Sequence, residues 1–349
     1  MTLTPLNVAL LGYGLAGRVF HAPLIVHTPG LRLHTVASSD AAKVQADFPD
    51  VAVVADPARV FADPGVDLVV VATPNATHAP LAIAALRAGR HVLVDKPLAT
   101  GLAEAERMVA AARESGRILS VFQNRRQDGD FLTLRGLVEE GRLGEVVELH
   151  SHFDRFRPAV ADRWRERAGP GAGLWFDLGP HLVDQVLQLF GMPLAVQADI
   201  AVQRPEAAVD DFFHVVLRYP RLRAVLHAGA LVAANGLRFA VHGTGGSYIK
   251  HGLDPQEAAL RAGIAPGAPG WGRDPQPGIL TVPDAEPQAL AGVDGDYRAC
   301  YAAMRDAILG SGAPPVTPDQ ALEVMQVLDA GVASAASGRS IDLRAPTRA

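Results

Sequence analysis

The chain has 349 residues, of which 49% are hydrophobic and 20% are charged, and its formal net charge is −5. This composition is typical of two folded domains with sizeable cores, and it excludes disordered, collagen-like and low-complexity chains. The acidic balance argues against nucleic-acid binding as the main role, because neutralising phosphates requires an excess of Lys and Arg. The single cysteine, Cys300, excludes a disulfide framework and any multi-cysteine zinc or iron–sulfur site.

The apolar runs and the N-terminal sequence indicate in which cell compartment the protein is expected. No apolar run approaches the roughly 20 residues that are needed to span a bilayer. The first residues lack the basic segment and the small-residue cleavage site of a secretory signal. We therefore expect a cytoplasmic protein that has neither a membrane nor a nucleic acid as a partner.

The first 122 residues alternate short apolar runs with segments of helical spacing, such as 78–88 and 102–115. Such alternation predicts right-handed crossovers and a parallel sheet covered on both faces. We therefore predict an N-terminal Rossmann domain, a doubly wound α/β fold, over residues 1–122. Its strands are expected at 7–11, 31–37, 51–54, 67–72, 91–94 and 118–122.

From about residue 145, strand-like segments follow one another directly. In 211–219 the alternate residues Phe213, Val215 and Leu217 are apolar, which predicts a sheet with one face poor in helices. The other strands are expected at 145–153, 195–203, 222–231, 237–243 and 247–251. Residues 123–349 are thus predicted to form an α+β domain with a large, mostly antiparallel open sheet and a C-terminal helix at about 318–336. The segment 262–296, rich in Gly and Pro, is interpreted as a surface excursion, either a variable loop or a lid.

A glycine-rich turn follows the first expected strand. The pattern G-x-G-x-x-G is formed by Gly12, Tyr13, Gly14, Leu15, Ala16 and Gly17. In this context Gly12 permits the tight turn, Gly14 lets the backbone approach a pyrophosphate, and Gly17 lets the helix pack on the strand. The N-terminus of the following helix offers N–H donors to phosphates. We therefore predict a dinucleotide site.

The end of the second strand bears on the choice of coenzyme. An NAD enzyme usually places a carboxylate about 20 residues after the glycines, to bind the ribose hydroxyls. Here Ser38 and Ser39 occupy that position, with Lys43 or Arg18 nearby to accept a phosphate. This pattern favours NADP. NAD remains the alternative if Asp40 reaches the ribose instead.

Polar residues also follow the later strands, where ligands of such sheets bind. They are Thr73, Pro74, Asn75 and His78 after the fourth strand, Asp95 and Lys96 after the fifth, and Asn124 and Arg125 after the sixth. Lys96 is the most suggestive of them, because it is expected at the nicotinamide end and Pro97 can hold it through a cis bond. The alternative is a lysine in a solvent-exposed loop.

Asp177 and His181 lie four residues apart, where Pro180 is expected in the first turn of an apolar helix. A carboxylate beside an imidazole favours a proton-transfer pair. The alternatives are a capping carboxylate and a core histidine. No third ligand with suitable spacing stands nearby, so we expect no metal site. The arginine-rich segment 154–167 is interpreted mainly as a solvated face, of which a few members could bind substrate hydroxyls.

These motifs together resemble the glucose–fructose oxidoreductase/inositol dehydrogenase (Gfo/Idh/MocA) family over essentially the whole length. The resemblance rests on LLGYGLAGRVFHAPL at 10–24, TPNATH at 73–78, DKP at 95–97 and DLGPH at 177–181. Within the family the chain is most similar to NADP-dependent scyllo-inositol dehydrogenases, through VFQNRRQDGDFLTL at 121–134 and HFDRFRP at 152–158.

The resemblance implies a Rossmann domain followed by a sheet domain that mediates oligomerisation, as a homodimer or homotetramer. It also implies catalytic roles for Lys96, Asp177 and His181, with either Lys96 or His181 as the proton acceptor. We expect substrate contacts from Arg125, His152, Asp154 and Trp164.

The predicted function is an NADP(H)-dependent dehydrogenase of a cyclic polyol or sugar, with scyllo-inositol as the leading substrate. One alternative is another sugar dehydrogenase or a keto-sugar reductase. The other is a non-catalytic NADP(H)-binding sensor, which would have no use for Lys96 together with His181.

Overall fold

The protein is described by a computed structural model that covers residues 4–234 and 236–343. Its contacts divide the chain into two compact units. The first unit holds the described residues up to Asn124 together with 256–271 and 296–322, and the second holds 125–255, 272–295 and the remainder from Glu323. Two segments that we placed in the second domain thus pack with the first unit.

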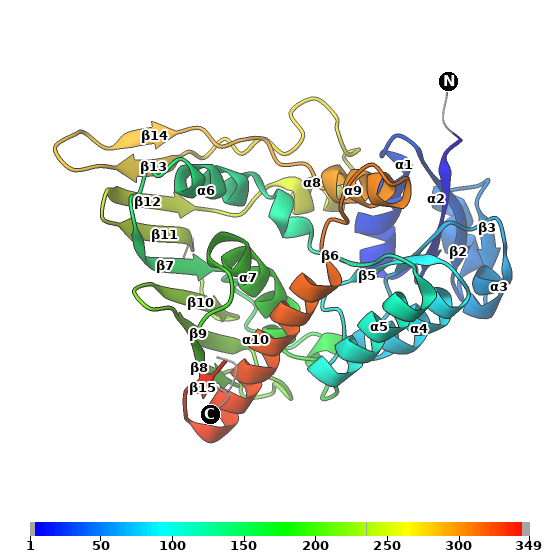
Figure 1. The fold of residues 1–349 in the computed structure, drawn as a ribbon, viewed down its shortest axis with the longest axis horizontal. Coiled ribbons are helices and arrows are strands. Elements are labelled where there is room, and N and C mark those ends of the chain that lie inside the picture. The colour runs from blue at the N-terminus through cyan, green and yellow to red at the C-terminus, as the bar shows by residue number, and fades with distance from the viewer. Residues whose placement is uncertain (1–3, 235, 344–349) are drawn as a thin grey trace. The chain divides into compact units, whose positions relative to one another are not determined.

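The described part of the first unit contains a six-stranded sheet in the order β3-β2-β1-β4-β5-β6, in which all neighbouring strands are parallel. This sheet is drawn in blue to cyan in Figure 1. This order is that of the doubly wound dinucleotide fold, as predicted. Strand β4 consists of Leu and Val residues that are all fully buried, as expected for a strand covered on both faces. The strands are β1 (Leu6–Leu11), β2 (Leu31–Ala37), β3 (Ala52–Val54), β4 (Leu68–Val71), β5 (His91–Asp95) and β6 (Leu119–Phe122).

The helices of the first unit include two short ones from the later segments. Tyr297 and Tyr301 enter the same buried core as Val8 and Leu10 of β1, which explains why these segments belong to this unit. A helical turn at Ala16–His21 precedes α1 (Ala22–Val26). The other helices are α2 (Ala41–Asp47), α3 (Pro57–Ala62), α4 (His78–Arg87), α5 (Leu102–Ser115), α8 (Gln256–Arg261) and α9 (Arg298–Ile308).

The described part of the second unit contains a nine-stranded sheet in the order β14-β13-β12-β11-β7-β10-β9-β8-β15. Its paired strands are antiparallel, except that β7 and β10 run parallel. The open, mostly antiparallel sheet that we predicted is thus confirmed. The strands are β7 (Val146–His152), β8 (Ala195–Ala201), β9 (Phe212–Arg218), β10 (Arg223–Gly229), β11 (Leu237–Gly243), β12 (Gly246–His251), β13 (Gly278–Thr281), β14 (Gln288–Leu290) and β15 (Ile341–Asp342).

One face of this sheet is buried and the other is more open. Along β9, Phe213, Val215 and Leu217 are fully buried, whereas His214 and Arg218 are exposed. Helix α7 (Leu174–Phe190) packs on β9 and β10. The Gly- and Pro-rich segment, interpreted above as an excursion, contributes the hairpin β13–β14 to one edge of the sheet.

Helix α7 begins earlier than we predicted. It starts at Leu174 after Gly173, so Pro180 lies inside the helix and the expectation of a first-turn proline is wrong. Gly179 leaves space for the Trp175 ring, because a Cβ at position 179 would lie only 2.6 Å from that ring.

Helix α10 (Pro318–Ser337) confirms the predicted C-terminal helix, and α6 (Gly129–Glu139) is a further helix of the second unit. Over the described residues, each helix falls short of the length and apolar character that a bilayer crossing requires.

Candidate active site

In the first unit, a hollow of about 340 Å³ opens at the ends of β1 and β2. The predicted cofactor residues Gly12, Tyr13, Gly14, Ser38, Ser39, Lys43 and Thr73 all line it, together with Asp40 and Pro57. Leu15 precedes the helical turn that contains Ala16 and Gly17. The hollow therefore brings together the glycine turn and the end of β2, where a dinucleotide fold binds a phosphate and the adenosine ribose.

The three glycines of the turn meet different surroundings. Gly12 has a φ of +93°, and a Cβ there would lie 2.7 Å from the carbonyl oxygen of Ala72. A Cβ on Gly17 would lie 2.1 Å from the carbonyl oxygen of Gly12, so the helical turn packs directly on the loop. A Cβ on Gly14, in contrast, would meet no heavy atom within 4 Å. This open space is what the approach of a pyrophosphate requires.

Hydrogen bonds within the loop after β2 position Ser38 and Asp40. The Asp40 carboxylate caps α2 by accepting from the Lys43 backbone N–H at 3.0 Å, and the Asp40 N–H donates to Ser38 Oγ at 3.1 Å. Arg18, which we considered as a phosphate ligand, instead forms an ion pair with Asp47 at 2.6 Å. The Tyr13 hydroxyl donates to the same carboxylate at 2.8 Å, and the hydrogen bond from Arg18 lowers the pKa of Asp47.

The loops after β4 and β5 are joined by His78. Its Nδ1 lies 2.9 Å from the carbonyl oxygen of Pro97, and its Nε2 lies 3.0 Å from that of Thr73. The ring is almost fully buried, as is the neighbouring Asn75. His78, expected as a cofactor residue, therefore fixes the two loops that carry Thr73, Pro74 and Lys96.

Lys96 adjoins a buried chain of polar groups. It is 9% exposed and is followed by the predicted cis bond to Pro97, and its backbone N–H donates to the Asp95 carboxylate at 2.8 Å. The Asp95 carboxylate lies 3.8 Å from His21 Nε2. On the other side of the ring, His21 Nδ1 lies 2.6 Å from the Tyr301 hydroxyl. Burial alone would raise the pKa of Asp95, but His21 and the charge of Lys96 lower it to about 2. Asp95 is therefore an anion at the base of the Lys96 loop.

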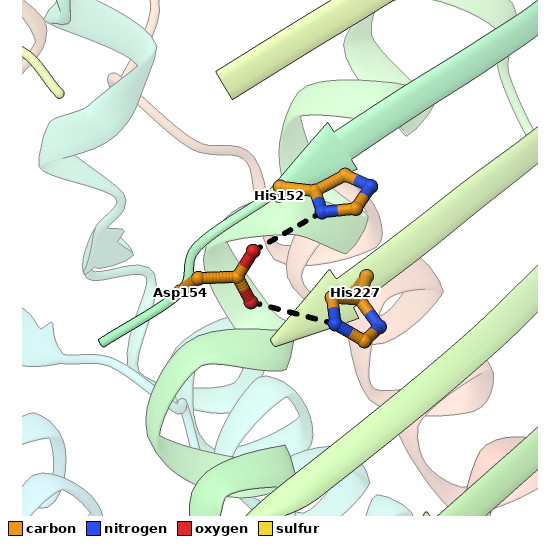
Figure 2. Close-up of side chains that lie close together, drawn as sticks. All are labelled: His152, Asp154 and His227. Atoms are coloured by element: carbon orange, nitrogen blue, oxygen red, sulfur yellow. Dashed lines mark hydrogen bonds and ion pairs between the residues drawn. The ribbon is translucent and has the colours of Figure 1, made fainter. Parts of the chain in front are cut away.

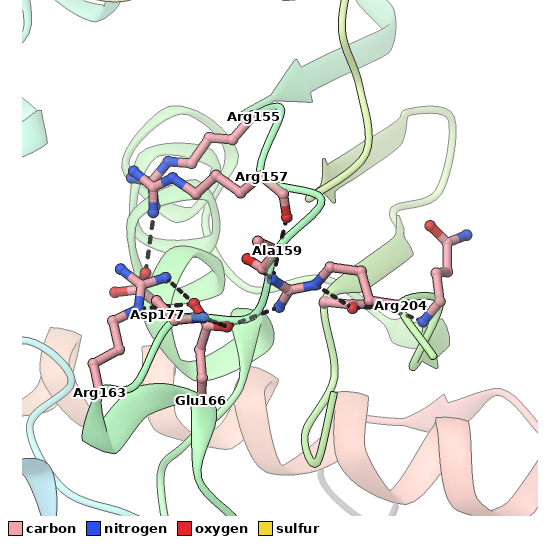
Figure 3. Close-up of polar contacts among 10 residues, drawn as sticks. Arg155, Arg157, Ala159, Arg163, Glu166, Asp177 and Arg204 are labelled. Carbon is pink, nitrogen blue, oxygen red and sulfur yellow. Dashed lines mark hydrogen bonds and ion pairs between the residues drawn. The ribbon is translucent and has the colours of Figure 1, made fainter. Parts of the chain in front are cut away.

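In the second unit, a small hollow of about 30 Å³ is lined by Asp177 of α7 and the charged side chains around it (Figure 3). Arg155 and Arg165 lie 3.5 and 3.4 Å from its two carboxylate oxygens. Figure 3 shows the Arg155 guanidinium directed at the Asp177 carboxylate. The wall also includes Arg163, Glu166, Arg204, Asp210 and Asp211.

Charged pairs hold this wall together. Glu166 accepts from Arg163 and forms an ion pair with Arg204 at 3.2 Å, and Arg204 donates to Asp211 at 2.7 Å. Burial opposes ionisation of Glu166 and Asp211, yet the hydrogen bonds and the arginine charges lower the pKa of both carboxyls. Arginine and carboxylate groups that can bind hydroxyl oxygens thus make up most of the lining, which also includes the apolar Leu174, Val209 and Ala230.

The other predicted residues of the second unit lie in different surroundings. His181 is 5% exposed and lies one turn after Asp177 on α7. Arg125 is also buried, donates to Asp128 at 3.1 Å and stacks over the Phe153 ring. Asn124, which belongs to the first unit, directly precedes Arg125 in a helical turn at Asn124–Gln127. Trp164 lies in a helical turn at Trp164–Glu166, where the Arg165 guanidinium covers its ring at 4.7 Å.

His152 and Asp154 meet His227 at the ends of β7 and β10 (Figure 2). The chain stays extended after β7, because Phe153 N–H and Arg155 N–H donate to the carbonyls of His227 and Gly229. Alternate residues of an extended chain point to opposite sides. His152 and Asp154 therefore lie on the other side of this chain from Arg155, which contacts Asp177.

Several residues of these sites were missed by the sequence analysis. The arginines at 155–165 were interpreted mainly as a solvated face, yet Arg155, Arg163 and Arg165 line the hollow beside Asp177. Arg204, His227 and Tyr301 carried no local motif, and His21 lies in the segment 10–24 but was assigned no role. Some of their partners are distant in sequence, since His21 and Tyr301 are 280 positions apart, so spacing alone gave no signal.

Comparison with known proteins agrees with this architecture. Residues 6–123 match the family profile "Oxidoreductase family, NAD-binding Rossmann fold", and residues 135–343 match "Oxidoreductase family, C-terminal alpha/beta domain", both of the Gfo/Idh/MocA group.

Individual relatives align over nearly the whole chain. YdgJ, an uncharacterized oxidoreductase of Escherichia coli, is 52% identical over 95% of this chain and 96% of its own. The scyllo-inositol 2-dehydrogenase (NADP(+)) IolW of Bacillus subtilis is 39% identical over 97% of this chain and 96% of its own. The solved structure of yvaA from Bacillus subtilis superposes with a TM-score of 0.95 at 39% identity, covering 99% of both chains. The chain therefore belongs to the Gfo/Idh/MocA family of NAD(P)-binding oxidoreductases.

Proposed function

We propose that this protein is an NADP(H)-dependent dehydrogenase that acts on a CH–OH carbon of a cyclic polyol or sugar, with scyllo-inositol and its ketone as the leading pair. The observation that carries the substrate class is the hollow around Asp177, whose wall consists largely of guanidinium and carboxylate groups. Such groups suit a ligand that presents many hydroxyls. The named activity of IolW supports the same class.

The coenzyme proposal rests on the loop after β2. Asp40 is engaged as the cap of α2, and the end of the strand itself carries the hydroxyls of Ser38 and Ser39. Lys43 lines the same hollow and can meet a 2′-phosphate. A carboxylate placed toward the ribose would repel that phosphate, and Ser38 brings none.

Replacing Ser38 by aspartate should reverse the coenzyme preference. The new carboxylate would repel the 2′-phosphate and raise the transition-state free energy with NADP by about 1–3 kcal/mol, which lowers kcat/KM with NADP. The effect on kcat/KM with NAD should be much smaller. Ser38→Ala is the matched control, because it removes the hydroxyl without adding charge. Initial rates measured with NADP and with NAD give the two kcat/KM values for each variant. A wild-type kcat/KM that is higher with NAD would contradict the proposal.

In the proposed reaction, bound NADP(H) accepts or supplies the hydride. We propose that His181 takes the hydroxyl proton during oxidation, that Lys96 stabilises the developing alkoxide, and that Asp177 orients the reacting groups. The reverse assignment, with Lys96 as the base, uses the same residues.

A substrate panel separates the proposal from its alternatives. Inositols, aldoses and keto-sugars should be offered with NADP or NADPH, and turnover followed by NADPH absorbance. Scyllo-inositol or its ketone should give the highest kcat/KM. A higher value for an aldose or a keto-sugar would move the assignment to another sugar, and tight NADPH binding without turnover of any compound would indicate a sensor.

We also propose that the protein is a homodimer or homotetramer, and we expect light scattering at micromolar concentration to show more than one chain. The support is the sheet face opposite α7, where Val216, Ile249 and Ile279 are not fully buried and Ile279 is 39% exposed. Covering such a face with a second copy removes apolar area from water. A monomer at that concentration would contradict this proposal.

A further inference from the structure

The cluster of His152, Asp154 and His227 is held in place by the backbone of two adjacent strands. His152 and His227 are register partners in the parallel pair β7–β10. Asp154 lies two residues beyond His152, and its Oδ1 accepts from the Gly229 backbone N–H at 3.0 Å. The three side chains converge at the ends of β7 and β10 (Figure 2).

The distances within the cluster match those between ligands of one metal ion. His152 Nδ1 lies 3.2 Å from one Asp154 oxygen, and His227 Nε2 lies 3.5 Å from the other. Ligand atoms at about 2.0–2.1 Å from a tetrahedral zinc ion are about 3.3–3.4 Å apart. All ligand atoms of the three residues lie within 4.8 Å of one another, so small ring rotations would close the set.

Neither ring nitrogen of His227 has a good hydrogen-bond partner among the described residues. Over the described residues its Nδ1 is buried and has no hydrogen-bond partner. Its Nε2 faces Asp154 only at the 3.5 Å ion-pair distance, whereas His152 makes a hydrogen bond of 3.2 Å to the same carboxylate. A cation between the rings would satisfy His227 Nε2 and the carboxylate together.

We propose that His152, Asp154 and His227 bind a divalent transition-metal ion of the Zn²⁺ or Co²⁺ type. Two imidazoles and one carboxylate suit such ions, in contrast to the all-oxygen sites of Mg²⁺ and Ca²⁺. The Gly229 N–H orients the carboxylate, as outer contacts do in metal sites.

Three protein ligands leave at least one coordination position open. His214 and His150 border the cluster on the same face of the sheet, with ring centroids 5.6 Å from His227 and 6.1 Å from His152. Water or one of these imidazoles would complete the coordination. The ion would join β7, β10 and the segment after β7, and it would stand on the opposite side of that segment from Arg155 and Asp177. Its effect is therefore expected on stability rather than on hydride transfer, and the proposal does not depend on the proposed function.

The test uses the full-length protein after EDTA treatment and desalting. Titration with Co²⁺ should produce the visible d–d absorption of a nitrogen- and oxygen-ligated ion, and calorimetry with Zn²⁺ should show saturable binding. His227→Ala and Asp154→Asn should each weaken Zn²⁺ binding by at least about 10–100-fold, since the loss of an outer contact alone costs that much. Zn²⁺ should also raise the Tm of the wild type and leave that of both variants unchanged.

Asp154→Asn keeps an oxygen for the Gly229 N–H, so it separates the loss of a ligand from the loss of the fold. His242→Ala is the matched control. His242 is the register partner of Glu148, which places it on the same sheet face, and it is bonded to Ser247. Wild-type affinity in His242→Ala, with unchanged circular dichroism in all variants, is the expected result. The proposal is overturned if the wild type gives no Co²⁺ spectrum and no Zn²⁺ heat, or if binding persists in both ligand variants.

Discussion

Replacing Lys96 or His181 by alanine should lower kcat by about 10²–10⁴-fold in each case, because this is the usual contribution of acid–base catalysis. Without His181 the hydroxyl proton has no acceptor, and without Lys96 the charge of the developing alkoxide has no cation beside it. NADP affinity should survive His181→Ala better than Lys96→Ala, because Lys96 follows β5, at the nicotinamide end of a dinucleotide fold. Stopped-flow turnover and NADPH fluorescence titration measure the two effects separately.

A surface histidine provides the control for this experiment. His27 is exposed after α1 and lies outside the proposed sites, so His27→Ala should retain wild-type kcat. The pH–rate profiles of the two variants then distinguish the base from the electrophile, since the limb that disappears belongs to the residue removed. Undiminished turnover in both variants, with tight NADPH binding, would exclude Lys96 and His181 from the mechanism and direct attention to Arg155 and Arg165.

The second large effect is expected on stability. Arg238 is 1% exposed on β11 and forms an ion pair with the fully buried Asp130 at 3.2 Å. It also donates to Ser151 at 3.0 Å and to Gln185 at 2.7 Å. Arg238→Met should lower the free energy of unfolding by about 3–5 kcal/mol, because it leaves a buried carboxylate without its countercharge.

The double variant Arg238→Met/Asp130→Asn tests the cause. It removes the buried carboxylate together with its partner, so much of the lost stability should return. Urea unfolding followed by circular dichroism gives the free energies. Equal losses in the single and double variants would show that packing and the bonds to Ser151 and Gln185, rather than the uncompensated charge, make Arg238 important.

The sequence predicted those parts of the fold that leave a local pattern. The continuous apolar run of β4 and the alternation in β9 identified the two sheets, and the glycine spacing identified the hollow at β1 and β2. The start of α7 was misplaced, because a proline is normally a sign of a first turn, whereas Pro180 lies inside a helix that begins at Leu174. Strands β13 and β14 were missed because they lie in the Gly- and Pro-rich segment that was interpreted as an excursion, and β15 was missed because it contains only two residues.

The motifs that contribute residues to the candidate site could be predicted from the sequence, but the contacts between these residues could not. Asp177 and His181 stood out through their spacing, whereas Arg204 became part of the same wall only through the fold. His152 and Asp154, which belong to the motif at 152–158, were expected to contact substrate. The alternation of an extended chain turns them to the opposite side, where they meet a histidine of the neighbouring strand β10 that is distant in sequence.

The short strands at the two edges of the second sheet affect how this protein can associate. A long, flat edge strand exposes a row of unpaired N–H and C=O groups, to which strands of other chains can add without limit. In the described part of this sheet one edge is β14, which offers only three residues. At the other edge β15 pairs with Ala195 and Val196 of β8, and the Ala198 N–H donates to the Ser334 hydroxyl at 2.9 Å. Growth of the sheet by addition of strands at β14 is therefore disfavoured, and the Ser334 hydroxyl engages one of the N–H groups that β8 would otherwise offer to another chain.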